Sequence, residues 1–146
     1  MSLTLFGFGA SRSFRCLWAL EEAGLDFEYI PLTFGSDEAG GSQCDDYLVR
    51  NPQGKVPTLQ HDDFVLTESA AILNYIDTLA DGRFIPKGAK ARAKYDELAS
   101  FVVTELEQPL WTFGKHRFAI PEEYRVEAIF ETANWEFKKA LNTLQK

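Results

Sequence analysis

Cysteine and histidine are scarce in this chain of 146 residues. It contains only Cys16, Cys44, His61 and His116. Two distant cysteines do not make a disulfide framework, and neither belongs to the Cys-x-x-Cys pair that dithiol redox chemistry requires. The two histidines are isolated and lack the spacing typical of metal ligands. The sequence therefore disfavours disulfide-rich, dithiol-redox and metal-binding proteins, and we expect neither a metal nor a cofactor.

Long apolar segments and clustered positive charge are also missing. No stretch is long enough to span a membrane, and residues 1–6 lack the basic start of a signal peptide. The formal net charge is −7 and there is no long basic run. Nucleic acid and anionic membrane surfaces are therefore not expected as partners. We expect a cytoplasmic protein.

The first half of the chain alternates between strand and helix patterns. Short apolar segments bounded by Gly, Asp or Pro predict strands, and apolar residues three and four apart predict helices. Ser11 or Ser13 can cap the first helix, and Gly24 ends it. The predicted order is β-α-β-α-β-β-α, with strands at 3–6, 27–32, 56–60 and 64–66, and helices ending near 23, at 45–49 and ending near 80.

The second half of the chain is predicted to be all helical. Residues 81–88 contain Gly82 and Pro86 and are typical of a linker between domains 1–80 and 89–146. Two long apolar stripes follow at helical spacing. Pro109 is expected to kink or end the first long helix, and Pro121 is a good start for the second. The chain thus combines an α/β domain with two long helices.

The most informative segment is Asn51–Leu59, with Glu68 and Ser69 shortly after it. Pro57 stands where a strand begins and cannot donate to a ladder. If its peptide bond is cis, the backbone of Val56 faces solvent and can pair with a bound peptide; a trans bond would simply mark a strand start. The helix start at Glu68-Ser69 offers a carboxylate site beside an acidic group. A plain cap by Thr67 is the alternative.

Three segments, in this order, resemble the cytosolic glutathione transferases. Ser11-Arg-Ser-Phe-Arg-Cys-Leu-Trp-Ala-Leu-Glu-Glu-Ala-Gly24 resembles the first helix of bacterial members. Asn51-Pro-Gln-Gly-Lys-Val-Pro-Thr-Leu59, followed by Leu66-Thr-Glu-Ser-Ala-Ala-Ile-Leu73, resembles their glutathione-binding half. The resemblance is strong over about 3–80 and weaker beyond. It implies an α/β thioredoxin-like N-terminal domain, an all-α C-terminal part and a homodimer.

The resemblance also assigns roles in glutathione binding. It implies that Pro57 is cis, that Val56 pairs with the cysteinyl backbone of glutathione, and that Glu68 and Ser69 hold its γ-glutamyl end. The residues that would face the glycyl carboxylate are Lys55 and, as weaker candidates, Gln43 and Gln53. Glutathione is expected as a substrate, not as a cofactor.

A hydroxyl is the expected catalytic group. The thiol of free glutathione, with a pKa near the ordinary cysteine value of about 8.5, is mostly protonated at neutral pH, and the thiolate is the nucleophile. Ser11 lies four residues before Arg15, as the catalytic serine does in serine-type members, and Ser13 is the alternative. The expected function is conjugation of glutathione to small hydrophobic electrophiles, as in detoxification. The alternative is a glutathione-binding or protein-interaction module with little or no catalysis.

The second substrate is expected to bind between the two domains. Phe8, Trp111 and Phe113 are candidates to line its pocket, with His116 also plausible. Members of the family normally carry more helices than the two long ones predicted here. We therefore expect the C-terminal part to be truncated, leaving an apolar face on the last helix that further chain or a partner would cover.

Overall fold

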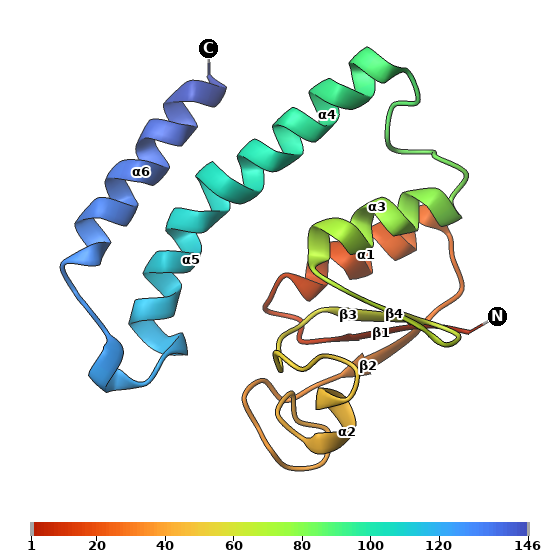
Figure 1. The fold of residues 1–146 in the computed structure, drawn as a ribbon, viewed down its shortest axis with the longest axis horizontal. Helices are drawn as coiled ribbons and strands as arrows, with labels where there is room; N and C mark the ends of the chain where they lie inside the picture. Colours follow the sequence, from red (N-terminus) through yellow and green to blue (C-terminus); the bar gives the residue numbers. More distant parts are fainter. Residues whose placement is uncertain (1, 146) are drawn as a thin grey trace. The chain divides into compact units, whose positions relative to one another are not determined.

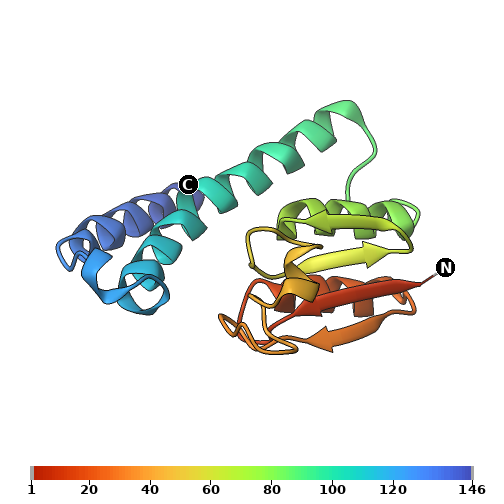
Figure 2. The ribbon, with the colours of Figure 1, turned by 60° about the horizontal axis from the view of Figure 1, so that its bottom comes forward.

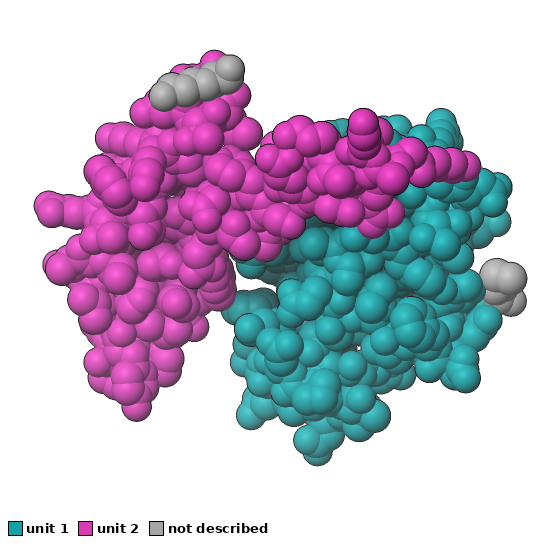
Figure 3. All heavy atoms as spheres, turned by 45° about the horizontal axis from the view of Figure 1, so that its top comes forward, with its two compact units in different colours: residues 1–86 teal, residues 87–146 magenta. Residues whose placement is uncertain are grey.

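The computed structural model describes residues 2–145 and divides into two compact units, residues 1–86 and 87–146 (Figure 3). The first unit is a four-stranded sheet with helices. The second unit is helical throughout its regular elements. Among the described residues, no helix is both long and apolar enough to cross a membrane.

The first unit is built on a mixed sheet in the order β2-β1-β3-β4 (Figure 1). Its strands are β1 (Leu3–Gly7), β2 (Glu28–Pro31), β3 (Thr58–His61) and β4 (Phe64–Thr67). Strand β1 runs parallel to β2 and antiparallel to β3, and β3 and β4 form a hairpin. The parallel pair requires a crossover, which α1 (Ser13–Ala23) provides.

Side chains on β1 alternate between two apolar clusters on opposite faces of the sheet. Leu3 and Leu5 pack with Leu59 and with α1 and α3 (Ser69–Leu79), whereas Phe6 packs with Leu32 on the other face. Helix α2 (Asp45–Leu48) covers that second face through Tyr47. Figure 2 shows α2 on the opposite side of the sheet from α1 and α3. The alternation follows from the two-residue period of a strand.

Predicted and observed elements in this unit differ by one or two residues at most strand and helix ends. The largest local difference lies before α1. Neither serine is the residue before the helix: that position is Arg12, which makes no side-chain cap bond. Gly24 ends the helix as predicted, with a left-handed φ of 66° that glycine adopts without strain.

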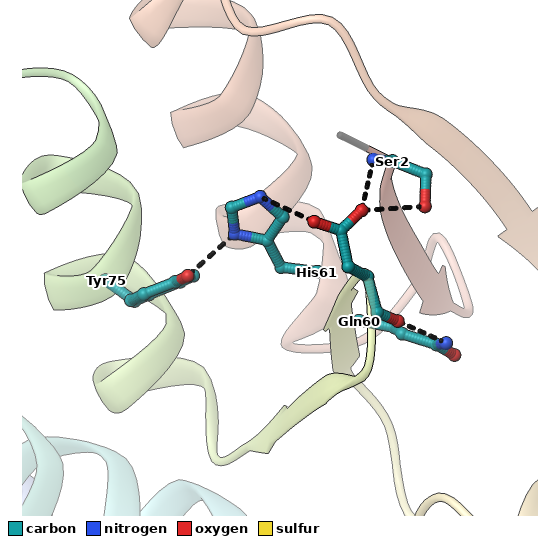
Figure 4. Close-up of polar contacts among 5 residues, drawn as sticks. Ser2, Gln60, His61 and Tyr75 are labelled. Carbon is teal, nitrogen blue, oxygen red and sulfur yellow. Dashed lines mark hydrogen bonds and ion pairs between the residues drawn. The ribbon is translucent and has the colours of Figure 1, made fainter.

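A polar cluster ties the hairpin to the chain start and to α3, at the end of the sheet where β1 begins (Figure 4). The carboxylate of Asp62 accepts the backbone N–H of Ser2 at 2.8 Å, and this bond lowers the pKa of Asp62. Nδ1 of His61 lies 2.7 Å from the hydroxyl of Tyr75. His61 ends β3, and its side chain is only 15% exposed.

The segment read as a linker is attached to the first unit. The buried carboxylate of Asp77 accepts the backbone N–H groups of Phe84 at 2.6 Å and Ile85 at 3.1 Å, and the side chain of Ile85 is buried. The compact unit therefore extends to Pro86. The positive φ of Asp81 and Gly82 turns the chain out of α3 before this segment.

The second unit begins with a continuous helical run. The run comprises α4 (Ala89–Phe101), a π-helical segment η1 (Val102–Glu107), α5 (Gln108–Gly114) and a second π-helical segment η2 (Lys115–Ala119). Pro109 was expected to kink or end the first long helix, and it does not end it. It lies in the first turn of α5, directly after η1. A proline lacks the N–H for an α-helical hydrogen bond, and its ring crowds the preceding turn. A wider π-helical turn accommodates the missing bond and the bulk of the ring.

The last helix begins later than the sequence predicts. Pro121 precedes only a short 3-10 segment η3 (Glu122–Tyr124), and α6 covers Ile129–Leu144. Arg125 has an extended backbone, and its guanidinium donates to the carbonyls of Ile120 and Phe118. The N–H of Val126 donates to Nδ1 of His116 at 3.2 Å. These bonds satisfy backbone groups that a helix would otherwise use. The predicted fold class, an α/β domain followed by a helical part with two long helical stretches, is confirmed.

Candidate functional site

Three segments singled out in the sequence meet at one end of the sheet. Strand β1 ends where β3 begins, because Phe6 pairs with Thr58. Strand β4 ends at the same place, because Thr58 also pairs with Thr67. The turn before α1, the Val56-Pro57 segment and the start of α3 therefore lie side by side. The sheet topology thus gathers a hydroxyl cluster, a backbone edge and a helix N-terminus.

The backbone edge is at Val56. The Val56-Pro57 peptide bond is cis, and Val56 precedes the first ladder residue of β3. Among residues 2–145, neither the N–H nor the C=O of Val56 has a hydrogen-bond partner. Val56 is half-buried and Pro57 is buried. Two adjacent backbone groups are thus available to pair with an extended ligand.

A buried hydrogen-bond network holds the residue before Val56, and sequence reasoning missed it. The Lys55 carbonyl accepts the Tyr47 hydroxyl at 2.5 Å and the Asn51 amide at 2.7 Å. The Tyr47 hydroxyl and the amide of Asn51 also contact Thr58 Oγ1, at 2.8 and 3.2 Å. Burial raises the pKa of Tyr47, which keeps its hydroxyl protonated as a donor. The signal in the sequence is Asn51, the first residue of the motif, together with Tyr47 four residues before it.

Replacing Tyr47 with phenylalanine tests this network. Because Asn51 would still serve Lys55 and Thr58, we expect Tyr47→Phe to lower the free energy of unfolding by only about 1–2 kcal/mol. Ligand affinity at Val56 should fall as well, since the segment would be held by one side chain instead of two. Urea unfolding measures the first effect. Tyr124→Phe, at an exposed tyrosine in η3, is the control and should change nothing.

The start of α3 is open to a ligand. Glu68 precedes the helix with φ 66° and ψ 112°, is exposed, and makes no side-chain cap bond. Thr67 lies in β4, so the alternative of a Thr67 cap is not what forms. The first N–H groups of any α-helix lack intrahelical partners. Ser69 is buried at the helix start, where its carbonyl lies 3.8 Å from the thiol of Cys16 in α1. A positive φ at a non-glycine residue is costly and often marks a functional site.

Two serine hydroxyls meet in the turn between β1 and α1. The hydroxyl of Ser11 donates to the carbonyl of Phe8 at 2.5 Å, and its oxygen accepts the N–H of Ser13 at 3.1 Å. The hydroxyl of Ser13 accepts the N–H of Phe8 at 3.1 Å and lies 2.9 Å from that of Ser11. Ser11 is half-buried, whereas Ser13 is only 1% exposed. Ser11 is therefore the hydroxyl that a ligand can reach.

The candidates for a second carboxylate contact are Lys55, Gln43 and Gln53, and all three are exposed. The amide of Gln43 donates to the carbonyl of Gly54 at 3.0 Å, so Gln43 lies next to Lys55 in space. Gly54 has φ 60°, and a Cβ at this position would lie 2.2 Å from the Gln43 amide nitrogen. Only glycine permits this approach. Gln53 is placed by its N–H bond to the side-chain oxygen of Asn51 at 3.2 Å.

The two cysteines differ in accessibility, and this difference gives a prediction. Burial raises the pKa of the Cys16 thiol to about 12, whereas Cys44 is only partly buried. Since the thiolate is the reactive form, we expect a thiol reagent at pH 8 to modify Cys44 and leave Cys16 untouched in the native protein. Labelling in denaturant should give two modified thiols. If both cysteines of the native protein were modified rapidly, the burial of Cys16 of α1 against α3 would be contradicted.

The candidates for the second-substrate pocket belong to different units. Phe8 follows β1 and stacks on Phe34 with ring centroids 6.4 Å apart. Trp111 and Phe113 lie in α5, where Phe113 packs on Phe130 of α6 at 4.5 Å. The structure thus gives each side chain a local partner or position within its own unit. The pocket itself stays a prediction.

Comparison with known proteins places the chain in a family. The family model "Glutathione S-transferase, N-terminal domain" matches residues 1–78. The chain folds as a thioredoxin-like domain followed by helices, the architecture of solved glutathione transferases. This protein belongs to the glutathione S-transferase family.

Individual relatives agree with this assignment. Glutathione S-transferase 1 of Zea mays is 49% identical over 61 residues, which cover 42% of this chain and 27% of the maize protein. A glutathione transferase structure from Methylococcus capsulatus has 33% identity and a TM-score of 0.80, covering 97% of this chain and 67% of that one. A theta-class enzyme structure from Xanthomonas axonopodis, with glutathione bound, has 28% identity and a TM-score of 0.77, covering 96% and 67%. The chain thus matches about a quarter of the length of the first curated relative.

Proposed function

We propose that this chain binds glutathione and activates its thiol for attack on small hydrophobic electrophiles, as a serine-type glutathione transferase. The observation that carries the proposal is the convergence of three groups of suitable chemistry at one end of the sheet. These are the unpaired backbone of Val56, the open start of α3 at Glu68, and the Ser11 hydroxyl. A structure of a related protein that holds glutathione supports the choice of ligand.

Each group suits one part of the tripeptide. The N–H and C=O of Val56 would pair with the cysteinyl backbone, as an added strand does. The N–H groups at the start of α3 and the Ser69 hydroxyl would bind the γ-glutamyl carboxylate, and Glu68 would bind the neighbouring ammonium. Lys55, Gln43 and Gln53 are the proposed contacts for the glycyl carboxylate. This arrangement leaves the sulfur at the turn that carries Ser11.

Ser11 would stabilise the thiolate by donating a hydrogen bond to it. On binding, the thiol proton passes to water, and the hydroxyl keeps its own proton. In the reaction with an aryl chloride, the sulfur forms a bond to the ring carbon and chloride leaves with the electrons of its bond. The products are the thioether, chloride and the proton released earlier. This chemistry requires no metal and no cofactor, so the proposed conjugation should proceed undiminished in EDTA.

Calorimetry with glutathione, followed by conjugation of a chlorodinitrobenzene, tests the proposal. S-methylglutathione is the matched ligand control, because it keeps every backbone and carboxylate contact but has no ionisable thiol. Binding of both compounds with turnover of glutathione supports the transferase. Binding without turnover supports the alternative, a glutathione-binding module. If neither compound binds, the proposal is refuted.

We also propose that the protein is a cytoplasmic homodimer. Light scattering tests the dimer.

A further inference from the structure

The α-carbon of Lys55 lies between two peptide groups, and side chains hold both of them. The carbonyl of Lys55 belongs to the peptide group that follows, and it accepts the Tyr47 hydroxyl and the Asn51 amide. The carbonyl of Gly54 belongs to the peptide group that precedes, and it accepts the side-chain amide of Gln43 at 3.0 Å. Because each peptide group is planar, holding both planes leaves the φ and ψ of Lys55 little freedom.

The side chain of Gln43 lies directly against the backbone of Gly54. A Cβ at position 54 would lie 2.2 Å from the amide nitrogen of Gln43, so nothing larger than glycine leaves room for the amide. Gly54 is buried, and its N–H donates to the Asn51 carbonyl at 2.8 Å. The Gly54 carbonyl is therefore offered to Gln43 by a turn that is itself closed by a hydrogen bond.

Gln43 stands at the end of a loop between β2 and α2 that makes its own hydrogen bonds. The N–H of Gln43 donates to the carbonyl of Ser36 at 2.8 Å. The hydroxyl of Ser42 is buried and accepts the N–H of Gly35 at 2.9 Å. This loop is thus a firm base for Gln43, and the Gln43 amide joins it to the segment that carries Lys55.

The constraint acts on a long, exposed and charged side chain. Lys55 is the one cation among the three candidates for the carboxylate contact, and its side chain has several rotatable bonds. The direction in which its Cβ leaves the backbone is set by φ and ψ. A fixed backbone therefore lowers the entropy cost of bringing the ammonium group to a bound carboxylate.

We propose that Gln43 is a positioning residue that aims Lys55 at the glycyl carboxylate of glutathione by holding the Gly54 carbonyl. The inference rests on the proposed function and narrows it. Of the three proposed contacts for this carboxylate, Gln43 acts on the ligand through Lys55 and not by touching it. The amide of Gln43 keeps its bond to Gly54 when glutathione binds, and the ammonium group of Lys55 pairs with the carboxylate.

The test is a double-mutant cycle of Gln43→Met and Lys55→Met, measured by calorimetry with glutathione. Methionine keeps the length of the Gln43 side chain but cannot donate to the Gly54 carbonyl. We expect Gln43→Met to weaken glutathione binding roughly three- to tenfold, the effect of one lost hydrogen bond. The KM for glutathione should rise by the same factor while kcat stays native, because the sulfur end of the site is unchanged. In the Lys55→Met background, Gln43→Met should cause no further loss.

Two controls separate this role from a direct contact and from a general disturbance of the fold. The glycyl ethyl ester of glutathione keeps the thiol and the peptide backbone but has no charge at its glycyl end. Both variants should therefore bind the ester like the native protein. Gln108→Met changes an exposed glutamine of α5, whose amide donates to the Thr112 hydroxyl at 3.3 Å, and should bind glutathione and the ester normally.

Three results would overturn the proposal. One is native glutathione affinity in Gln43→Met. Another is a loss of the same size in the Lys55→Met background, because Gln43 would then contact the ligand itself. The third is an equal loss of affinity for the ester, because the whole site would then be disturbed. If the native protein binds neither glutathione nor its ester, the proposed function is refuted instead.

Discussion

Ser11→Ala is expected to lower kcat for conjugation at pH 7 by up to roughly 30-fold, because the variant lacks the hydroxyl that stabilises the thiolate and only the thiolate reacts. The pKa of the bound glutathione thiol should return to its ordinary value of about 8.5, so that only a few per cent is thiolate at pH 7. The deficit should therefore shrink as the pH rises toward 9, because the uncatalysed ionisation then supplies the thiolate. Stopped-flow conjugation from pH 6 to 9 measures this profile.

A loss of stability in Ser11→Ala would not explain this decrease in kcat. The Ser11 oxygen accepts one N–H in the first turn of α1, which is worth about 1 kcal/mol of stability. Urea unfolding should show this small loss and no more. Thr78→Ala, which removes an exposed hydroxyl from α3, serves as the control with native kinetics. If Ser11→Ala kept the native rate at pH 6.5, the hydroxyl would have no role in thiolate stabilisation.

Glu68→Gln is expected to weaken glutathione binding by roughly ten- to a hundredfold, because a charge-assisted bond to the ammonium group becomes a neutral one. The amide has the same shape as the carboxylate, so the backbone should not change. Calorimetry with glutathione measures the loss. An analogue that lacks the amino group should bind the native protein and the variant about equally.

The backbone at position 68 allows binding and stability to be separated. Glu68 has φ 66°, which costs a non-glycine residue about 1–3 kcal/mol. Glu68→Gly should therefore stabilise the fold while still losing glutathione affinity. A loss of both would show that the carboxylate also supports the native structure. A gain of stability with unchanged affinity would remove Glu68 from the site.

Much of the first unit could be predicted because its signals are local. Gly24 ends α1, the apolar alternation of Leu3 and Leu5 specifies a buried strand, and Asp62-Asp63 turn the hairpin. The position of the site follows from these strands and helices, since the sheet register alone brings Val56 and Glu68 to the same end of the sheet. What was missed is non-local. The bonds of Tyr47 and Asn51 to the Lys55 carbonyl depend on the packing of α2 under the sheet.

Errors in the second unit have the same origin. A proline normally interrupts a helix, and sequence spacing carries no sign of the π-helical turn that lets the helix pass Pro109. The late start of α6 depends on Arg125 and His116 capturing backbone groups from ten residues or fewer along the chain. Those captures require a folded turn to exist first, and apolar periodicity cannot reveal them.

The bonds of Asp77 bear on how the protein can be divided into parts. The family match ends at residue 78, but the amides of Phe84 and Ile85 bind the buried Asp77 carboxylate. A fragment cut after Ala80 would leave that carboxylate without these amide donors and would remove the buried side chain of Ile85. A fragment ending at Pro86 keeps both. The compact first unit is therefore longer than the aligned segment, and residues 81–86 are part of its fold.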